Sequence, residues 1–180
     1  MLRRRMGLPT LIAVSVWSVA TVWVFSAPDV SIPELVTIAV GWYALGGFWL
    51  ARLIGGLVAG GWQVVRSSWK WWASPALLVI VTSAAVVTHA PLMLRFNLSR
   101  DAMDAFAVQV MEGDDPDPSR VGWFPVKRVE TFPGGMRFIT GDCMVDKCGF
   151  AYSPQGRPPR ITEDSYFRLD GPWYLWDESW

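Results

Sequence analysis

The chain has 180 residues, of which 52% are hydrophobic, and its 16 basic and 16 acidic side chains give a formal net charge of zero. A chain with neither net positive charge nor a basic stripe lacks the electrostatic footprint of a nucleic-acid-binding protein, so nucleic acid is excluded as a partner. The charges are unequally divided, because 24 of the 32 charged side chains follow Leu94. The sequence therefore predicts an apolar membrane region followed by a soluble domain.

Three segments of the first half are long and apolar enough to cross a bilayer. A membrane-spanning helix needs about 20 mostly apolar residues, since the hydrocarbon core is about 30 Å thick. Glu34 and Arg52 are the only charged residues within the three segments. We predict a transmembrane region over residues 1–94. Its helices are expected at about 8–25, 32–58 and 71–94.

The basic residues of the loops predict the orientation, because Lys and Arg favour the cytoplasmic side. The loop between the first two segments has Asp29 as its only charged residue. Arg95 and Arg100 at the third exit oppose the orientation that the other basic residues favour. Those other residues are Arg3, Arg4, Arg5, Arg52, Arg66 and Lys70. We expect a multi-pass protein of the cell membrane with a cytoplasmic N-terminus and an extracytoplasmic C-terminal domain.

The first segment also resembles a secretory signal peptide that would be cleaved after Ser26. Trp17 and Trp23 are bulky for the core of a signal peptide, which favours an uncleaved helix. Cleavage would leave the C-terminal domain outside, because the two remaining segments would still return the chain to that side. The predicted side of the domain is therefore the same under both interpretations.

A ladder of small residues runs along the second segment at fourfold spacing, with a GxxxG pair beside it. Such ladders let helix backbones approach closely in lipid. Two interpretations stay open: packing among the three predicted helices, or an interface with another membrane protein or a second copy. Arg52 would either reach the cytoplasmic interface or make a polar contact inside a bundle, and the chain after it is expected to tilt or break at glycines. The residues are Gly47, Ala51, Gly55 and Ala59, with Gly56 and Gly60 as the pair.

The region 95–180 predicts a small extracytoplasmic α+β domain. Ser99 is a plausible N-cap for an amphipathic helix that ends at Gly113. Several strand-like runs follow, and the turn signals at 133–135 and 170–172 separate them into hairpins. We therefore expect one helix packed on an antiparallel sheet of four or five strands, after three transmembrane helices.

Cys143 and Cys148 are the only cysteines, and they favour a structural disulfide. A disulfide can form and persist outside the cytoplasm. Closing so short a ring would stabilise the domain by about 2 kcal/mol. A metal site with Asp142 and Asp146, a redox-active pair and free thiols are the alternatives, but the metal set lacks histidine and the spacing is not CxxC. No metal and no cofactor are expected.

The single histidine, His89, lies near the outer end of the third segment. A multi-histidine metal site or a histidine-based triad is therefore not expected from this chain. A helix-end residue bonded to a neighbouring helix is the favoured interpretation, and proton sensing is the alternative.

The C-terminal run "WYLWDESW" is unusually aromatic. In a strand its side chains alternate between two faces, with Trp173, Leu175 and Asp177 on one. One face would fill the core. The other would either be buried or lie at the bilayer interface, or form a recognition surface for a sugar or a partner chain. The candidate binding residues are Trp123, Tyr174, Trp176, Glu178 and Trp180.

The sequence favours a non-enzymatic, membrane-anchored protein. Its extracytoplasmic domain would bind a partner subunit or cell-envelope ligand, as part of a membrane complex that includes lipid and another membrane protein or a second copy. The alternative is an enzyme or enzyme subunit at the outer membrane surface that uses Glu163, Asp164 or Glu178. Glu163 and Asp164 are adjacent rather than facing, so nothing marks them as a paired acid and base.

Four runs of the C-terminal half carry a resemblance. In chain order they are "RVG", "PGGMRFIT", "GFAYSPQGRPP" and "GPWYLWDESW". Together with the multi-span N-terminus, they resemble small membrane-anchored proteins of high-GC Gram-positive bacteria. The resemblance implies the membrane-anchored architecture and no activity.

Overall fold

The computed structural model divides the chain into two compact units. The helical unit comprises Met1–Val24 and Pro33–His89, and the sheet unit comprises Phe25–Ile32 and Ala90–Trp180. The loop between the first two helices therefore belongs with the C-terminal domain. The structure describes residues 7–67, 69–114, 119–143, 146–159 and 164–178.

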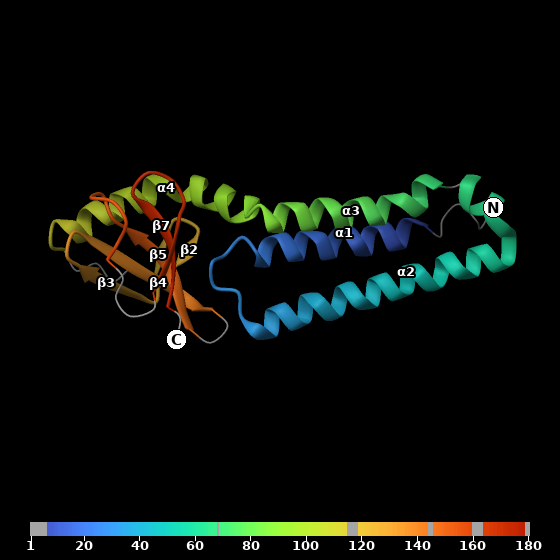
Figure 1. The fold of residues 1–180 in the computed structure, drawn as a ribbon, viewed down its shortest axis with the longest axis horizontal. Coiled ribbons are helices and arrows are strands. Elements are labelled where there is room, and N and C mark those ends of the chain that lie inside the picture. The colour runs from blue at the N-terminus through green and yellow to red at the C-terminus, as the bar shows by residue number, and fades with distance from the viewer. Residues whose placement is uncertain (1–6, 68, 115–118, 144–145, 160–163, 179–180) are drawn as a thin grey trace. The chain divides into compact units, whose positions relative to one another are not determined.

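The helical unit contains α1 (Gly7–Val24), α2 (Ile32–Ser67) and α3 (Trp69–Val87) (Figure 1). Two of these are long and apolar enough to cross a membrane within the described residues, over Ile32–Val58 and Trp69–Val87. Within the described residues the apolar run of α1, Leu8–Val24, is shorter. The structure thus supports two candidate spans rather than the expected three.

α2 contacts α1 at particular side chains of the helical unit. The Trp17 indole donates a hydrogen bond to the Ile38 carbonyl at 3.2 Å, and Arg52 Nη1 donates one to Thr10 Oγ1 at 2.8 Å. Arg52 therefore makes a polar contact between helices, one of its two expected roles. The helix is kinked at Gly61, whose backbone has φ 66° and ψ −178°, so the expected break at a glycine is confirmed.

The sheet unit contains one helix, α4 (Ala90–Met111), among its described residues. The boundary expected at residue 94 falls inside this helix, because α3 ends at Val87 and α4 begins at Ala90. His89 lies between the two helices with a left-handed φ of 53°. Pro91 suits the first helical turn, where its missing N–H costs nothing. Ser99 is therefore inside α4, and its predicted role as the N-cap is wrong.

Two antiparallel sheets follow α4. The small one pairs β1 (Arg120–Val121) with β2 (Phe124–Pro125). The larger sheet has five strands in the order β3-β4-β5-β7-β6, so the expected helix on a four- or five-stranded antiparallel sheet is confirmed. Its strands are β3 (Arg128–Phe132), β4 (Gly135–Cys143), β5 (Asp146–Tyr152), β6 (Ser165–Arg168) and β7 (Trp173–Asp177).

α4 covers one face of the larger sheet, which we call the inner face. Phe96 and Phe106 of the helix are buried against aromatic residues of β4, β5 and β7, including Phe138 and Trp173. The Trp173 indole N–H donates a hydrogen bond to Asp104 Oδ1 at 2.7 Å. The side chain with the largest volume in this core therefore keeps its polar atom satisfied.

Candidate functional site

The outer face of the larger sheet holds a second buried cluster. The expected alternation of β7 is observed, because Trp173 and Leu175 pack in the inner core while Tyr174 and Trp176 join Tyr166 on the other face. Tyr174 is 7% exposed and Trp176 is 1% exposed. A ligand would therefore reach these two rings only after neighbouring residues had moved.

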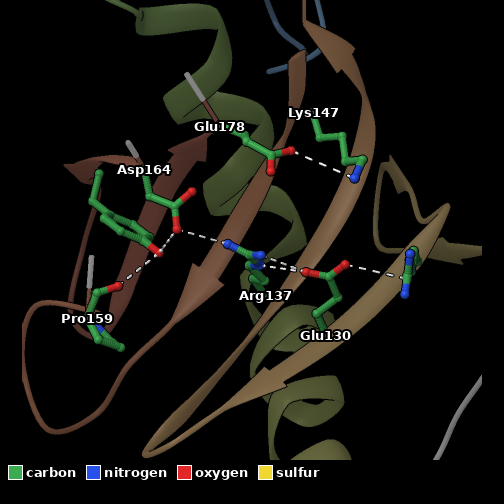
Figure 2. Close-up of polar contacts among 8 residues, drawn as sticks. Glu130, Arg137, Lys147, Pro159, Asp164 and Glu178 are labelled. Carbon is green, nitrogen blue, oxygen red and sulfur yellow. Dashed lines mark hydrogen bonds and ion pairs between the residues drawn. The ribbon is translucent and has the colours of Figure 1, made fainter. Parts of the chain in front are cut away.

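An arginine crosses this face of the sheet. Arg137 of β4 stands opposite Ala151 in β5, and this small neighbour leaves room for the arginine side chain to extend across the sheet. Its guanidinium carbon lies 4.2 Å from the centroid of the Trp176 ring, which is a cation–π contact. Figure 2 shows this guanidinium between two carboxylates from different parts of the chain.

The two carboxylates are Glu130 of β3 and Asp164, which immediately precedes β6. Arg137 Nε donates to Glu130 Oε2 at 2.8 Å, and Nη1 donates to Asp164 Oδ2 at 3.1 Å. Asp164 is 4% exposed, whereas Glu130 is half-buried. Burial alone would lower the pKa of Arg137, but the hydrogen bond and charge of Glu130, together with the charge of Asp164, raise it. The cation is thus fixed between its partners.

Tyr166 completes the network, which we call the Arg137 network. Its hydroxyl lies 3.2 Å from Asp164 Oδ2 and 3.4 Å from the Pro159 carbonyl oxygen (Figure 2). Burial, followed by the charge and hydrogen bond of Asp164, raises the pKa of Tyr166 to about 12. A general acid or base works best with a pKa near the operating pH. Tyr166 and Arg137 do not titrate near neutrality, so these two groups are better suited to holding the face together than to proton transfer.

The candidate acids lie in three different situations. Asp164 is held in the Arg137 network, and Glu178 forms an ion pair with Lys147 at 3.8 Å on a more exposed part of the domain (Figure 2). Glu163 lies outside the described residues. Among the residues that the structure describes, no three His, Cys, Asp or Glu side chains are placed to hold a metal ion.

Of the remaining aromatic candidates, the structure describes only Trp123, which is not part of the outer cluster. Trp123 lies in the turn between β1 and β2 and is 51% exposed. Trp180 lies outside the described residues. An exposed aromatic residue that the sequence did not single out is Phe167 of β6, at 57%. The run of alternating residues around Tyr166 is too short to predict which neighbouring side chains are exposed.

Most described residues of the predicted ladder of α2 are exposed rather than packed on another described helix. Gly47, Ala51 and Gly55 are exposed, and no heavy atom of another described helix lies within 4 Å of the position a Cβ would take at either glycine. Gly56 faces the Trp72 ring, with 3.4 Å between that position and the ring. Gly60 is half-buried, and the side chain of Ala59 lies outside the described part of the chain. The close approach that the sequence missed is at Gly41, where a Cβ would overlap the Trp17 indole.

The predicted disulfide between Cys143 and Cys148 is confirmed. It joins β4 to β5, with 5.6 Å between the two Cα atoms. The carbonyl oxygen of Pro28 lies 2.7 Å from Cys143 Sγ. This is a close contact rather than a hydrogen bond, because a disulfide sulfur carries no proton.

The neighbour of Pro28 lies against the same hairpin. A Cβ added to Gly141 would overlap the Asp29 side chain, so the loop approaches β4 as closely as glycine allows. The loop Phe25–Ile32 and the disulfide-bonded hairpin thus form one packed site within the sheet unit. No local pattern in the loop sequence signals this contact, since its partner is more than a hundred residues away.

Comparison of the chain with protein-family models, curated proteins and solved structures finds no match.

Proposed function

We propose that this protein is a non-enzymatic, multi-pass membrane protein that presents its sheet unit outside the cytoplasm. There the sheet unit would bind a partner subunit or cell-envelope ligand within a membrane complex. The observation that carries the proposal is the loop Phe25–Ile32, which packs on the disulfide-bonded hairpin of the C-terminal domain. Disulfides persist in oxidising compartments, so the disulfide favours the extracytoplasmic side for both.

The connections of the two candidate spans support this topology. The sheet unit contains the loop that precedes α2 and also contains α4, which follows α3. A chain that crosses the membrane in α2 and returns in α3 ends on the side from which it started. Arg66 and Lys70 lie where one helix gives way to the other, on the opposite and therefore cytoplasmic side.

A binding role accounts for the sheet unit better than catalysis does. Arg137 and Tyr166, the central groups of the outer face, do not titrate near neutrality. β6, at one edge of the larger sheet, presents the exposed ring of Phe167. Aromatic residues are enriched in protein interfaces, and an edge strand offers unpaired backbone groups. We assign the partner-binding surface to β6 around Phe167.

Affinity purification of the full chain in mild detergent tests the proposal. The wild type should recover a stoichiometric membrane partner, and Phe167→Ser should lose it. Val108→Ser is the matched control, because Val108 is an exposed apolar residue of α4. Repeated recovery of the wild type alone, or equal loss in both variants, would contradict the proposal.

Thiol labelling of intact cells tests the location independently. A membrane-impermeant maleimide should leave Cys143 and Cys148 unmodified until a reductant is added, and then label both. Ready labelling without reductant would show that the disulfide is absent in the cell.

A further inference from the structure

The first turns of α4 expose an apolar face. Leu94 and Leu98 are four residues apart, so they lie on the same side of the helix, and they are 63% and 67% exposed. Asn97 is exposed beside them. One turn further on, the exposed Asp101 replaces the leucines, so the outer surface changes from apolar to charged near residue 99.

The one cation in these turns is directed elsewhere. Arg95 Nη1 donates to Ser26 Oγ at 3.2 Å, and Nη2 donates to the Trp123 carbonyl oxygen. The guanidinium carbon lies 4.8 Å from the centroid of the Phe124 ring. Arg95 therefore bonds within the sheet unit and places no charge between the two exposed leucines.

Trp123 is fixed to α4 at the level where the polarity changes. Its backbone N–H donates to Ser99 Oγ at 3.0 Å, and that hydroxyl donates to the Arg95 carbonyl at 2.9 Å. Gly122 has φ 58°, and a Cβ there would overlap Ser99, so the turn requires glycine. The turn holds the Trp123 backbone against α4, and the Trp123 side chain is exposed.

We propose that Leu94, Leu98 and Trp123 form a lipid-contacting surface that seats the sheet unit on the headgroup region of the outer leaflet. Chain continuity identifies lipid as the occupant, because α4 begins three residues after the candidate span α3 ends. At about 1.5 Å per residue, Leu98 lies about 12 Å along α4 from its start. Tryptophan is enriched at membrane–water interfaces, where leucine side chains can reach the acyl boundary and charged residues such as Asp101 stay in water.

Site-directed spin labelling of the full chain tests this inference, which rests on the membrane placement proposed above. Both cysteines are disulfide-bonded, so an introduced cysteine is the only free thiol. Leu94→Cys, Leu98→Cys and Trp123→Cys would carry a nitroxide in vesicles of phosphatidylcholine and phosphatidylglycerol. Val108→Cys, about 15 Å further along α4 than Leu98, is the aqueous control. Ile80→Cys, on the exposed surface of α3, is the bilayer control.

The measurement is the ratio of collision rates with oxygen, which concentrates in lipid, and with a water-soluble nickel chelate. We expect this ratio to be several-fold higher at the three proposed positions than at Val108. If the ratio at the three positions equals that at Val108 while the label at Ile80 is in lipid, the lipid contact is overturned but the membrane placement is not. Exclusion of both reagents would overturn the lipid contact in favour of a protein partner. A water-exposed label at Ile80 would overturn the membrane placement as well.

Discussion

The inner and outer faces of the five-stranded sheet are built from the same strands but are stabilised differently. The inner face packs Phe138 and Trp173 against α4, so burial of apolar area contributes most there. The outer face places the Arg137 guanidinium over Trp176 and between two carboxylates, so its stability depends on keeping charged groups paired. On the inner face, removing a methylene group lowers the free energy of unfolding, because it leaves a cavity. On the outer face, the larger loss comes from removing one member of a charged pair.

The largest effect is expected from a cavity in the inner face. Trp173→Ala should lower the free energy of unfolding by about 3 to 5 kcal/mol, because it removes a fully buried indole and its hydrogen bond to Asp104 Oδ1. Trp173→Phe is the matched control and should cost less, since it keeps most of the ring. Chemical denaturation of the detergent-solubilised chain, followed by tryptophan fluorescence, measures both. Equal costs would show that lost packing does not cause most of the destabilisation.

Removing one charged member of the Arg137 network should lower the free energy of unfolding by about 3 kcal/mol. Arg137→Met keeps an apolar stem but leaves Asp164 charged and buried. Combining it with Asp164→Leu should restore part of the loss in the same denaturation experiment. Lys147→Met breaks only a solvent-accessible pair and should change stability by less than about 0.5 kcal/mol. If the double variant were as unstable as the single one, the buried carboxylate would not explain the loss.

Removing the disulfide tests a contribution to stability that does not depend on the packing of either face of the sheet. The Cys143→Ala and Cys148→Ala pair should lower the stability by about 2 kcal/mol, because the unfolded chain regains the freedom that the short ring removed. Addition of reductant to the wild type should give a similar shift in the denaturation midpoint. A midpoint that does not move would mean that the contact with Pro28 holds the hairpin without the bond.

Among the variants of the Arg137 network, Tyr166→Phe should have a smaller effect than Arg137→Met, about 1 kcal/mol near neutral pH, because one hydrogen bond to Asp164 is lost. The wild type should also lose stability at high pH. The folded pKa of Tyr166, about 12, lies above the ordinary value of 10, so its contribution is complete below pH 10 and is lost as the pH rises toward about 12. Denaturation midpoints across this window should fall more for the wild type than for Tyr166→Phe. If the midpoints of the wild type and of Tyr166→Phe fell equally with pH, Tyr166 would not contribute to the stability of the Arg137 network.

Local patterns in the sequence were sufficient to predict much of the sheet unit. The glycine and proline turns at 133–135 and 170–172 separated the strands correctly, and the spacing of Cys143 and Cys148 indicated the disulfide. The start of α4 was misplaced because an apolar stretch reads the same in a span and in a buried helix. Ser99 resembled an N-cap, but its hydroxyl bonds the Arg95 carbonyl one turn earlier.

Local sequence patterns could not predict the side-chain contacts of the outer face. Arg137, Glu130 and Asp164 are separated in sequence and meet through strand pairing and through a connection that brings Asp164 beside β4. The aromatic run of β7 was recognised, and its alternation was predicted correctly. The charged side chain that covers this aromatic run was not predicted. In the sequence, a charged residue that stacks on a tryptophan cannot be distinguished from an exposed charged residue.

The loop Phe25–Ile32 has a consequence for the order in which the protein is made. Its partners, Gly141 and Cys143, are synthesised more than a hundred residues later. The loop must therefore wait, already translocated under the proposed topology, until the hairpin arrives. The sheet unit cannot be completed from the C-terminal half alone, so under the proposed topology its assembly would also depend on correct insertion of α2 and α3.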